Sequence, residues 1–520
     1  MADKLVLIAG AGPTGLVLAL WLTKLGVKVR IIDKVAEPGT TSRALAVQAR
    51  TLEFYHQVGF DDVAVAGGVK IQKLNFWVGG RRRAGVTLQD TGKGMTPYAF
   101  ALVLPQDAHE RLLIAQLEKL GVRVERQTEL LRFTQREDGV TAILRRADGS
   151  EESFDASYLA GCDGASSTVR GQLGIGFPGG TYTGLFYVAD VVAKGAAVDG
   201  HLNVDIEDAD FILLFPLKGA GHVRLVGTVH DVPGAEHGKL TFDDVRGKAM
   251  EHLGLVVEKV NWFSTYRVHH RVSLRFRDRR AFLLGDAAHI HSPVGGQGMN
   301  TGIGDAVNLA WKVASVLKGT APATLLDTYE PERIGFARRL VATTDRGFTV
   351  VTSRGSLAAL VRTRLVPLVV PVLFRLPAMR RLLFRTVSQT LVNYRDSSLS
   401  VGAAGKVQGG DRLPWVDLGG TDNFAPLTSV DWQVHVYEGR GTRDEGRGLR
   451  EACAALGLPL HVFAWQPRMG EIGLEQGAAY LVRPDGYVAL ADPSADPDKL
   501  RGYLADRGIT TNTTGRAVKA

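Results

Sequence analysis

The chain has 520 residues, of which 45% are hydrophobic and 22% charged, so it is long enough for about two to four globular domains. Its net charge of +8 comes from lysines and arginines that are mostly scattered, which argues against a nucleic-acid groove. The two cysteines form neither a disulfide framework nor a set of metal ligands, and no signal peptide or membrane span is recognisable, so we expect a cytoplasmic protein.

The chain opens with a strand, a glycine-rich turn, a helix and a second strand. Residues 4–9 form an apolar run of strand length, and GAGPTG follows at residues 10–15. Residues 16–25 have the apolar spacing of a helix, and residues 27–32 form another strand that ends at Asp33. This order of elements is typical of a dinucleotide-binding unit.

Each residue of this turn has a predicted role. Gly10 allows the tight turn, Gly12 lets the backbone approach a pyrophosphate, and Gly15 lets the helix pack closely on the strand. The helix N-terminus attracts phosphates, and the Asp33 carboxylate can accept hydrogen bonds from a ribose. NAD and FAD share the ADP half that these groups bind, so the local pattern leaves both open.

A second motif, LAGCDGASSTVR, occupies residues 159–170. Taken alone it predicts a strand, a turn and a short helix, with Ser166 or Ser167 as the N-cap.

Residues 182–277 predict a sheet with one helix. Strands are expected at residues 186–192, 202–205, 211–215 and 223–228, and a helix at residues 242–253. Phe211, Leu213 and Phe215 alternate along one strand and therefore share a face, although the pattern does not tell which face of the sheet. They could also be simple core residues.

The third motif is GDAAHIHSPVGGQGMN at residues 285–300. It follows a buried strand pattern at residues 280–285, places Asp286 at the carboxyl end of that strand, and leads into a helix predicted at residues 301–317. No second strand–acid unit accompanies this glycine loop, so it is not an independent dinucleotide site. His289 and His291 have no further ligand at suitable spacing, so we expect no metal site.

Two later stretches bear on organisation. Residues 365–374 are apolar but contain two prolines and are bracketed by Arg364 and Arg375, which favours packed helical core over a basic amphipathic surface element.

Residues 405–414 are glycine-rich and predict a domain boundary. Beyond them we expect strands at 432–437 and 460–465, a helix at 450–456, and a hairpin of residues 479–482 and 487–490 around Arg-Pro-Asp-Gly.

The three motifs, in this order, resemble the FAD signatures of the class A flavin-dependent aromatic hydroxylases, the p-hydroxybenzoate hydroxylase-like family. The resemblance covers about the first 340 residues, and the tail resembles the thioredoxin-like domain of phenol and polyketide hydroxylases, without a CxxC motif. It implies an α/β fold: a Rossmann-like FAD domain of GR2 type, an inserted α+β substrate domain and a thioredoxin-like C-terminal domain. The implied boundaries are 1–178 and 277–400 for the FAD domain, 179–276 for the substrate domain and 401–520 for the tail.

The resemblance also implies which residues surround FAD. Asp286 would accept hydrogen bonds from the ribityl or pyrophosphate region, and the helix after the third motif would stabilise negative charge on the reduced flavin. Arg43 and Pro293 would lie in the flavin environment as catalytic residues, although Arg43 could instead be a solvated or phosphate-pairing arginine. The implied cofactor-binding set is Gly10, Gly12, Pro13, Thr14, Gly15, Asp33, Arg43, Gln106, Asp163, Asp286, Pro293, Gly296, Gly298, Met299 and Asn300. Gln106 could instead serve a helix N-terminus, and Asp163 a structural turn.

The implied reaction is hydroxylation of a phenol by a flavin C4a-hydroperoxide, with O2 and with NADPH or NADH as reductant. The chain has no second Rossmann unit for the nicotinamide nucleotide. Relatives that take small hydroxybenzoates hold the substrate carboxylate with a serine and an arginine, whereas FILLFPLK here contains Phe215, Pro216 and Leu217. We therefore expect a bulky or polycyclic phenolic substrate lined by Phe211, Leu213 and Phe215, and a monomer or homodimer. Baeyer–Villiger-type oxygenation, a flavin oxidase or dehydrogenase, and an inactive flavin-binding scaffold are the alternatives.

Overall fold

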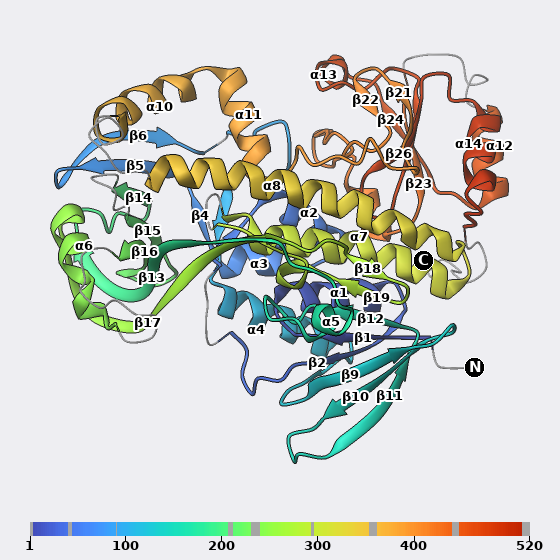
Figure 1. The fold of residues 1–520 in the computed structure, drawn as a ribbon. Helices are drawn as coiled ribbons and strands as arrows, with labels where there is room; N and C mark the ends of the chain where they lie inside the picture. Colours follow the sequence, from blue (N-terminus) through green and yellow to red (C-terminus); the bar gives the residue numbers. More distant parts are fainter. Residues whose placement is uncertain are drawn as a thin grey trace.

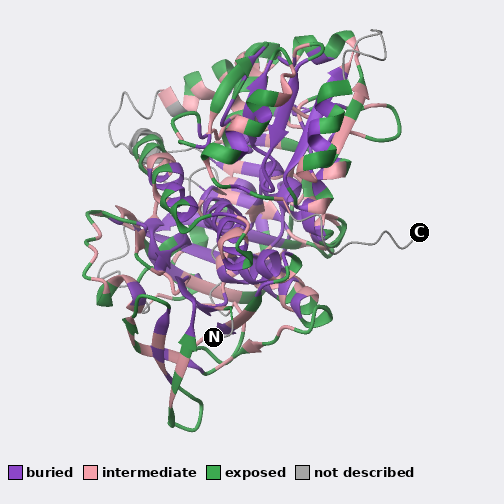
Figure 2. Ribbon diagram, turned by 90° about the vertical axis from the view of Figure 1, so that its right-hand side faces the viewer, coloured by how far each residue is buried: buried purple, intermediate pink, exposed green. Residues whose placement is uncertain are grey.

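The computed structural model describes residues 4–39, 44–89, 91–205, 212–229, 240–292, 296–352, 361–438 and 447–511. Three large sheets organise these residues, and helices cover the first and third of them (Figure 1). Buried segments are concentrated inside these layers and exposed residues on the outer helices and loops (Figure 2). The predicted α/β fold class, with an inserted sheet and a C-terminal domain, is confirmed.

The first sheet brings the three sequence motifs together. Its order is β18-β19-β12-β1-β2-β8, and every pairing except that of β18 with β19 is parallel. The strands are β1 (Leu5–Ala9), β2 (Lys28–Ile32), β8 (Val124–Glu125), β12 (Tyr158–Gly161), β18 (Arg277–Asp278) and β19 (Ala281–Leu283). Because parallel strands end at the same edge, the turns after β1, β12 and β19 meet there.

Helices and a small antiparallel sheet contribute to one core with this sheet, which explains why its strands are continuous apolar runs. Helix α1 (Pro13–Lys24) packs against α7 (Gly298–Lys318) and α4 (Gln106–Lys119), and residues 16–22 are at most 1% exposed. The remaining helices of this part are α2 (Ala49–Val58), α3 (Asp61–Gly67), α5 (Thr168–Gln172) and α8 (Tyr329–Thr352). Two small sheets complete it: β3 (Ala46–Val47), β7 (Ala101–Val103) and β4 (Val69–Ile71); and β11 (Glu151–Ala156), β10 (Val140–Arg145) and β9 (Glu129–Gln135).

The second sheet has the order β20-β17-β13-β16-β15-β14-β5-β6. Its strands are β5 (Lys73–Val78), β6 (Arg81–Thr87), β13 (Gly179–Gly195), β14 (Leu202–Asp205), β15 (Ile212–Pro216), β16 (His222–Val229), β17 (Leu255–Val272) and β20 (His289–Ile290), with α6 (Arg246–Leu253) beside them. Residues 73–87 were predicted to belong to the first part of the FAD domain. They extend this sheet because β5 pairs in parallel with β14, a contact between distant segments that local sequence patterns do not report.

Helices α10 (Val366–Arg375) and α11 (Pro377–Val387) lie outside this sheet, near β5 and β6 (Figure 1). Val366, Val370 and Phe374 pack against the apolar cluster around Phe76 and Val86. The opposite side of α10 is exposed, so the prediction of packed core is wrong for that side. Among the described helices, none is both long and apolar enough to cross a membrane.

The third sheet, β22-β21-β26-β25-β23-β24, belongs to the C-terminal part. Its strands are β21 (Val401–Ala404), β22 (Val407–Gln408), β23 (Gln433–Glu438), β24 (Leu460–Ala464), β25 (Ala479–Val482) and β26 (Val488–Asp492), and its helices are α12 (Arg447–Leu456), α13 (Pro467–Glu471) and α14 (Pro497–Asp506). The predicted strand–helix–strand unit and hairpin are confirmed. Part of the glycine-rich stretch 405–414 forms the turn between β21 and β22.

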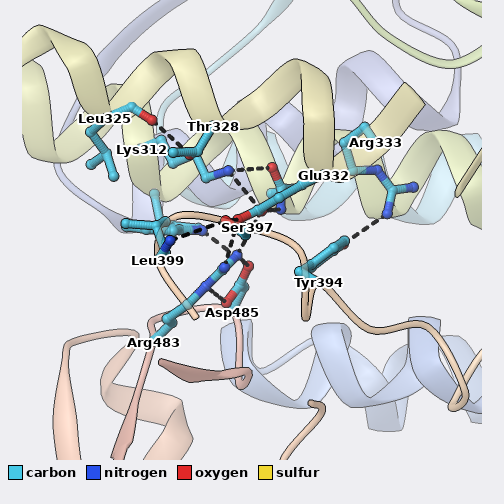
Figure 3. A network of polar contacts seen from close by, with 12 residues as sticks. Lys312, Leu325, Thr328, Glu332, Arg333, Tyr394, Ser397, Leu399, Arg483 and Asp485 are labelled. Carbon is cyan, nitrogen blue, oxygen red and sulfur yellow. Dashed lines mark hydrogen bonds and ion pairs between the residues drawn. The ribbon is translucent and has the colours of Figure 1, made fainter. Parts of the chain in front are cut away.

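The turn of that hairpin anchors the C-terminal part to the helices of the first sheet (Figure 3). Arg483 donates to both oxygens of Glu332 on α8, at 2.9 and 3.1 Å, and to Asp485 at 2.6 Å. Lys312 on α7 donates to Glu332 at 2.8 Å. These four side chains are at most 1% exposed, so the charges remain buried only because each has a partner. Burial would raise the pKa of Glu332, but Arg483 and Lys312 lower it well below its usual value.

Candidate cofactor and substrate site

The glycine turn after β1 has the geometry that a bound pyrophosphate requires. Gly10 has φ +101°, and a Cβ there would lie 2.2 Å from the carbonyl oxygen of Cys162 in the second motif. A Cβ on Gly15 would lie 2.0 Å from the carbonyl oxygen of Gly10, so both positions need glycine for close packing. A Cβ on Gly12 would meet nothing within 4 Å. Gly12 is also the N-cap of α1, with Pro13 as its first residue, so open space lies beside free backbone N–H groups.

The end of β2 supplies a carboxylate beside this turn. Asp33 Oδ2 accepts a hydrogen bond from the Ala11 N–H at 2.7 Å, and its Oδ1 accepts one from Val35 N–H at 3.0 Å. Arg126 Nη1 lies 3.7 Å from Asp33 Oδ2, and Arg126 Nη2 is buried with no hydrogen-bond partner among the described residues. Arg126 was not among the predicted cofactor residues, because it follows the short strand β8 and belongs to no recognisable motif.

The second motif lies against the first. Asp163 Oδ2 accepts from the Val169 N–H at 3.1 Å, while its Oδ1 is buried and accepts no hydrogen bond from the described residues. Ser167 is the N-cap of α5, which confirms that part of the prediction. Arg170 donates to the carbonyl oxygen of Ala287 at 2.8 Å and so ties this motif to the third.

The third motif packs directly on the first. A Cβ on Gly285 would lie 2.6 Å from Thr14 Oγ1, and a Cβ on Gly302 only 2.3 Å from the same atom. The start of α1 and the first turns of α7 are therefore in close contact. Asp286 is exposed in the short turn after β19. Helix α7 begins at Gly298, three residues before the predicted start, so Met299 and Asn300 belong to its first turn.

Asn300 has a positioning role that the motif alone does not indicate. Its Oδ1 accepts from the Gln48 N–H at 2.9 Å and from Thr51 Oγ1 at 2.8 Å, and its Nδ2 donates to the carbonyl oxygens of Ala46 and Gly296. With both of its amide atoms engaged in this way, the buried Asn300 side chain joins the start of α2 to the N-terminus of α7.

Beneath the third motif lies a buried charge cluster that the sequence analysis missed. Asp305 on α7 accepts hydrogen bonds from Gly285 N–H at 3.0 Å and Arg333 Nε at 2.6 Å, and it lies 2.7 Å from His289 Nε2. Burial would raise the pKa of Asp305, but Arg333 and His289 hold it below its usual value. Asp305 lies on the side of the predicted helix opposite Ile303 and Val307, so the helical pattern gave no signal that it is buried. His289 therefore has a structural partner, and within the described residues no group of His, Cys, Asp or Glu is arranged to hold a metal ion.

His291 lies at the N-terminal end of α7. Its Nδ1 is 2.7 Å from the carbonyl oxygen of Ser292, and its Nε2 is buried without a partner among the described residues. Burial lowers the pKa of His291 to about 4, so the ring is neutral near pH 7. Because Nδ1 donates to a carbonyl, Nε2 is left as a hydrogen-bond acceptor.

The remaining predicted cofactor residues have mixed outcomes. Gln106 is the first residue of α4; its Nε2 donates to Glu110 at 2.8 Å and its Oε1 lies 3.4 Å from the Ala44 N–H. Gly296 has φ +61° and lies just before α7. Arg43 and Pro293 lie outside the described residues.

The two described residues of the predicted substrate set lie on one face of the second sheet. Leu213 and Phe215 lie on the face that also carries Phe186, Val188 and Tyr266, and Phe215 additionally contacts the cluster of Leu45, Ile71 and Val103. The other face, with Ile212 and Leu214, packs a separate core. Phe211 lies outside the described residues.

A buried ion pair lies on the same face and was also missed. Arg224 pairs across the strands with Phe215, is fully buried, and donates to both oxygens of Asp190 at 2.6 and 2.7 Å. It also approaches the carbonyl oxygen of Ala44 at 3.5 Å. The sequence feature that could have indicated this pair is a single charged residue in each of two apolar strands, LFYVADVV and HVRLVG.

The described residues fit FAD at the ADP end. Open space at Gly12, the N-terminus of α1, the Asp33 carboxylate and the unpartnered Arg126 nitrogen are the groups that a pyrophosphate and a ribose would need. Gly302 of α7 lies against Thr14 of the first motif, so a ligand bound by the first motif could extend along the third.

Comparisons with known proteins agree with this interpretation. The family described as FAD binding domain matches residues 3–344. The chain is 36% identical to a 6-methylpretetramide 4-monooxygenase of Streptomyces rimosus, over 98% of this chain and 91% of that protein. It is 32% identical to pentachlorophenol 4-monooxygenase of Sphingobium chlorophenolicum, over 68% of this chain and 66% of that protein. The solved structure of OxyS anhydrotetracycline hydroxylase from Streptomyces rimosus is similar with a TM-score of 0.77 at 30% identity, covering 97% of this chain and 99% of that one.

Proposed function

We propose that this protein hydroxylates a bulky, uncharged phenolic ring with NAD(P)H as the reductant. The chain belongs to the FAD binding domain family and is a flavin-dependent monooxygenase of aromatic compounds. The observation that carries the proposal is the convergence of three distant motifs at one edge of the first sheet, with open space beside Gly12, the glycine that would face a pyrophosphate.

In this proposal different groups at that edge bind different parts of FAD. Gly12 and the N-terminus of α1 bind the pyrophosphate, with Pro13 and Thr14 in the same turn, and Asp33 accepts hydrogen bonds from the ribose. Asp163 and Asp286 face the middle of the cofactor, and Gly296, Gly298, Met299 and Asn300 form the helix start beside the flavin ring. Arg43, Gln106 and Pro293 complete the flavin environment.

The substrate class follows from the face that carries Phe215. Leu213, Phe215 and the neighbouring aromatic side chains present apolar surface, and the one arginine described there, Arg224, is bound bidentately to Asp190. A guanidinium held in this way is not available for a substrate carboxylate, because releasing it would leave Asp190 without its partner. An uncharged phenol of large apolar area therefore suits this face better than an anionic benzoate. Relatives named for 6-methylpretetramide and anhydrotetracycline support the same class.

Bound FAD would supply the redox chemistry that uses the hydride of NAD(P)H and O2 to put one oxygen atom on the ring and to release the other as water. The protein's contribution is electrostatic and steric. The positive end of the α7 helix dipole favours negative charge on the reduced ring, and the apolar face of the second sheet excludes water.

The test is the visible spectrum of the FAD-loaded protein, recorded anaerobically with NADPH or NADH and with or without a panel of phenols. We expect flavin bleaching that one phenol accelerates, followed after admission of ¹⁸O2 by a product that contains one labelled oxygen atom. Hydrogen peroxide as the only oxygen product would identify an oxidase instead. An oxygen atom inserted beside a ketone would identify Baeyer–Villiger chemistry.

A further inference from the structure

The outer side of α10 and α11 combines exposed apolar and basic side chains. Leu365, Leu368, Val369, Val372 and Leu376 are 52%, 69%, 38%, 54% and 52% exposed. Their spacing of three and four residues places them in one stripe along the helix. Soluble proteins expose single apolar residues commonly but contiguous stripes rarely, so this stripe indicates a binding surface.

The charged residues of the segment that carries the stripe all have one sign. Residues 361–387 contain six arginines, and no aspartate or glutamate occurs from residue 346 to residue 395. Arg364 and Arg375 lie at the two ends of the stripe and are exposed, as is Arg381 on α11. Helix α10 packs on β6, which carries three further exposed arginines at positions 81–83.

We propose that this α10–α11 surface binds the surface of an anionic lipid bilayer. Helices that lie in the bilayer interface carry leucine and valine on one side and arginines beside them. Their apolar side chains enter the acyl region, and their arginines contact phosphate groups. The surface is fixed to the protein on its other side by Val366, Val370 and Phe374, so it is displayed without unfolding.

The charge pattern favours a bilayer over a second copy of the chain. A two-fold contact through this surface would place its arginines against the same arginines of the partner, with no acidic residue of the segment to neutralise them. An anionic bilayer supplies the missing negative charge over a continuous plane.

The test is co-sedimentation of the FAD-loaded, full-length protein with vesicles of phosphatidylcholine alone or with about a third phosphatidylglycerol. We expect binding only to the anionic vesicles and its loss at high salt, because salt screens the arginines. Arg380→Glu with Arg381→Glu should weaken binding by more than about 25-fold, since each arginine near the surface contributes about fivefold. Leu368→Ser with Val372→Ser should weaken it by about tenfold without affecting folding, because both side chains are already exposed.

The matched control is Arg145→Glu with Arg146→Glu, an adjacent exposed pair at the end of β10, far in sequence from the stripe. Its vesicle binding should stay within about twofold of the unsubstituted protein, allowing for its contribution to overall charge. Three results would overturn the proposal: no binding to anionic vesicles, equal loss in the control and the Arg380/Arg381 variant, or a dimer in solution that Leu368→Ser with Val372→Ser dissociates while no vesicle binding is seen.

Discussion

Alanine at Gly12 and alanine at Gly15 should separate cofactor binding from folding. The two glycines are three residues apart in one turn, but their surroundings differ. A Cβ at Gly15 would lie 2.0 Å from the Gly10 carbonyl oxygen, where ordinary contact is 3.4–4 Å, so the backbone would have to move by more than 1 Å. Gly12 has φ −76°, which alanine adopts freely, and no atom lies within 4 Å of the position that the alanine methyl group would occupy.

The magnitudes follow from these distances. Overpacking at Gly15 should cost about 1–3 kcal/mol of unfolding free energy or more. Gly12→Ala should cost up to about 1 kcal/mol, because alanine is a poorer N-cap than glycine. In the proposed complex, however, the new methyl group occupies the place of the pyrophosphate. Losing one charge-assisted hydrogen bond from the backbone costs about 1.5–3 kcal/mol, which weakens FAD binding by about 10- to 100-fold.

The assays are urea unfolding of both FAD-free variants and titration of FAD by the quenching of its fluorescence. We expect Gly12→Ala to unfold near the unsubstituted protein and to bind FAD poorly, and Gly15→Ala to be unstable before FAD is added. If Gly12→Ala bound FAD with unchanged affinity, the pyrophosphate would not lie against this turn. If it lost as much stability as Gly15→Ala, the space beside Gly12 would not be open in the folded protein.

Three further predictions concern charged and titratable groups. Asp33→Asn should weaken FAD binding by about tenfold, because a neutral amide accepts a weaker hydrogen bond from the ribose than a carboxylate does. It should also lower the unfolding free energy of the FAD-free protein by about 1–3 kcal/mol, because the amide cannot accept from both the Ala11 and the Val35 N–H groups. Unchanged affinity in the same titration would exclude the proposed ribose contact. Arg483→Met should lower the unfolding free energy by about 3–5 kcal/mol in urea, since it leaves Asp485 and Glu332 without their shared guanidinium, and a loss below about 1 kcal/mol would show that water reaches this turn. Burial lowers the pKa of His109 to about 3. Between about pH 6.5 and pH 3 the unfolded chain therefore binds a proton that the folded protein does not, so the unfolding free energy should fall with decreasing pH. His109→Gln should reduce that slope by up to about 1.4 kcal/mol per pH unit, measured by urea unfolding at successive pH values, and an unchanged slope would show that His109 is protonated in the folded state.

The sequence by itself determined the elements whose cause is local. Gly10 and Gly15 are recognisable because a tight turn and close backbone contacts exclude other residues, and the strands β1, β12 and β19 are recognisable because sheets covered on both faces need continuous apolar runs. Parallel pairing then requires that the turns after these strands meet. The α/β fold class and the cofactor-binding edge could therefore be predicted.

Only the tertiary structure decided the features that depend on partners distant in the chain. The addition of β5 to the second sheet, the Arg224–Asp190 pair and the Asp305–Arg333 pair each join segments separated by at least 28 residues, and nothing in either segment specifies the other. The same is true of α10, whose apolar sequence predicts core although the sheet beneath it covers only one side. Burial and ion pairing are properties of contact, and contact between distant segments is set by packing of the whole chain.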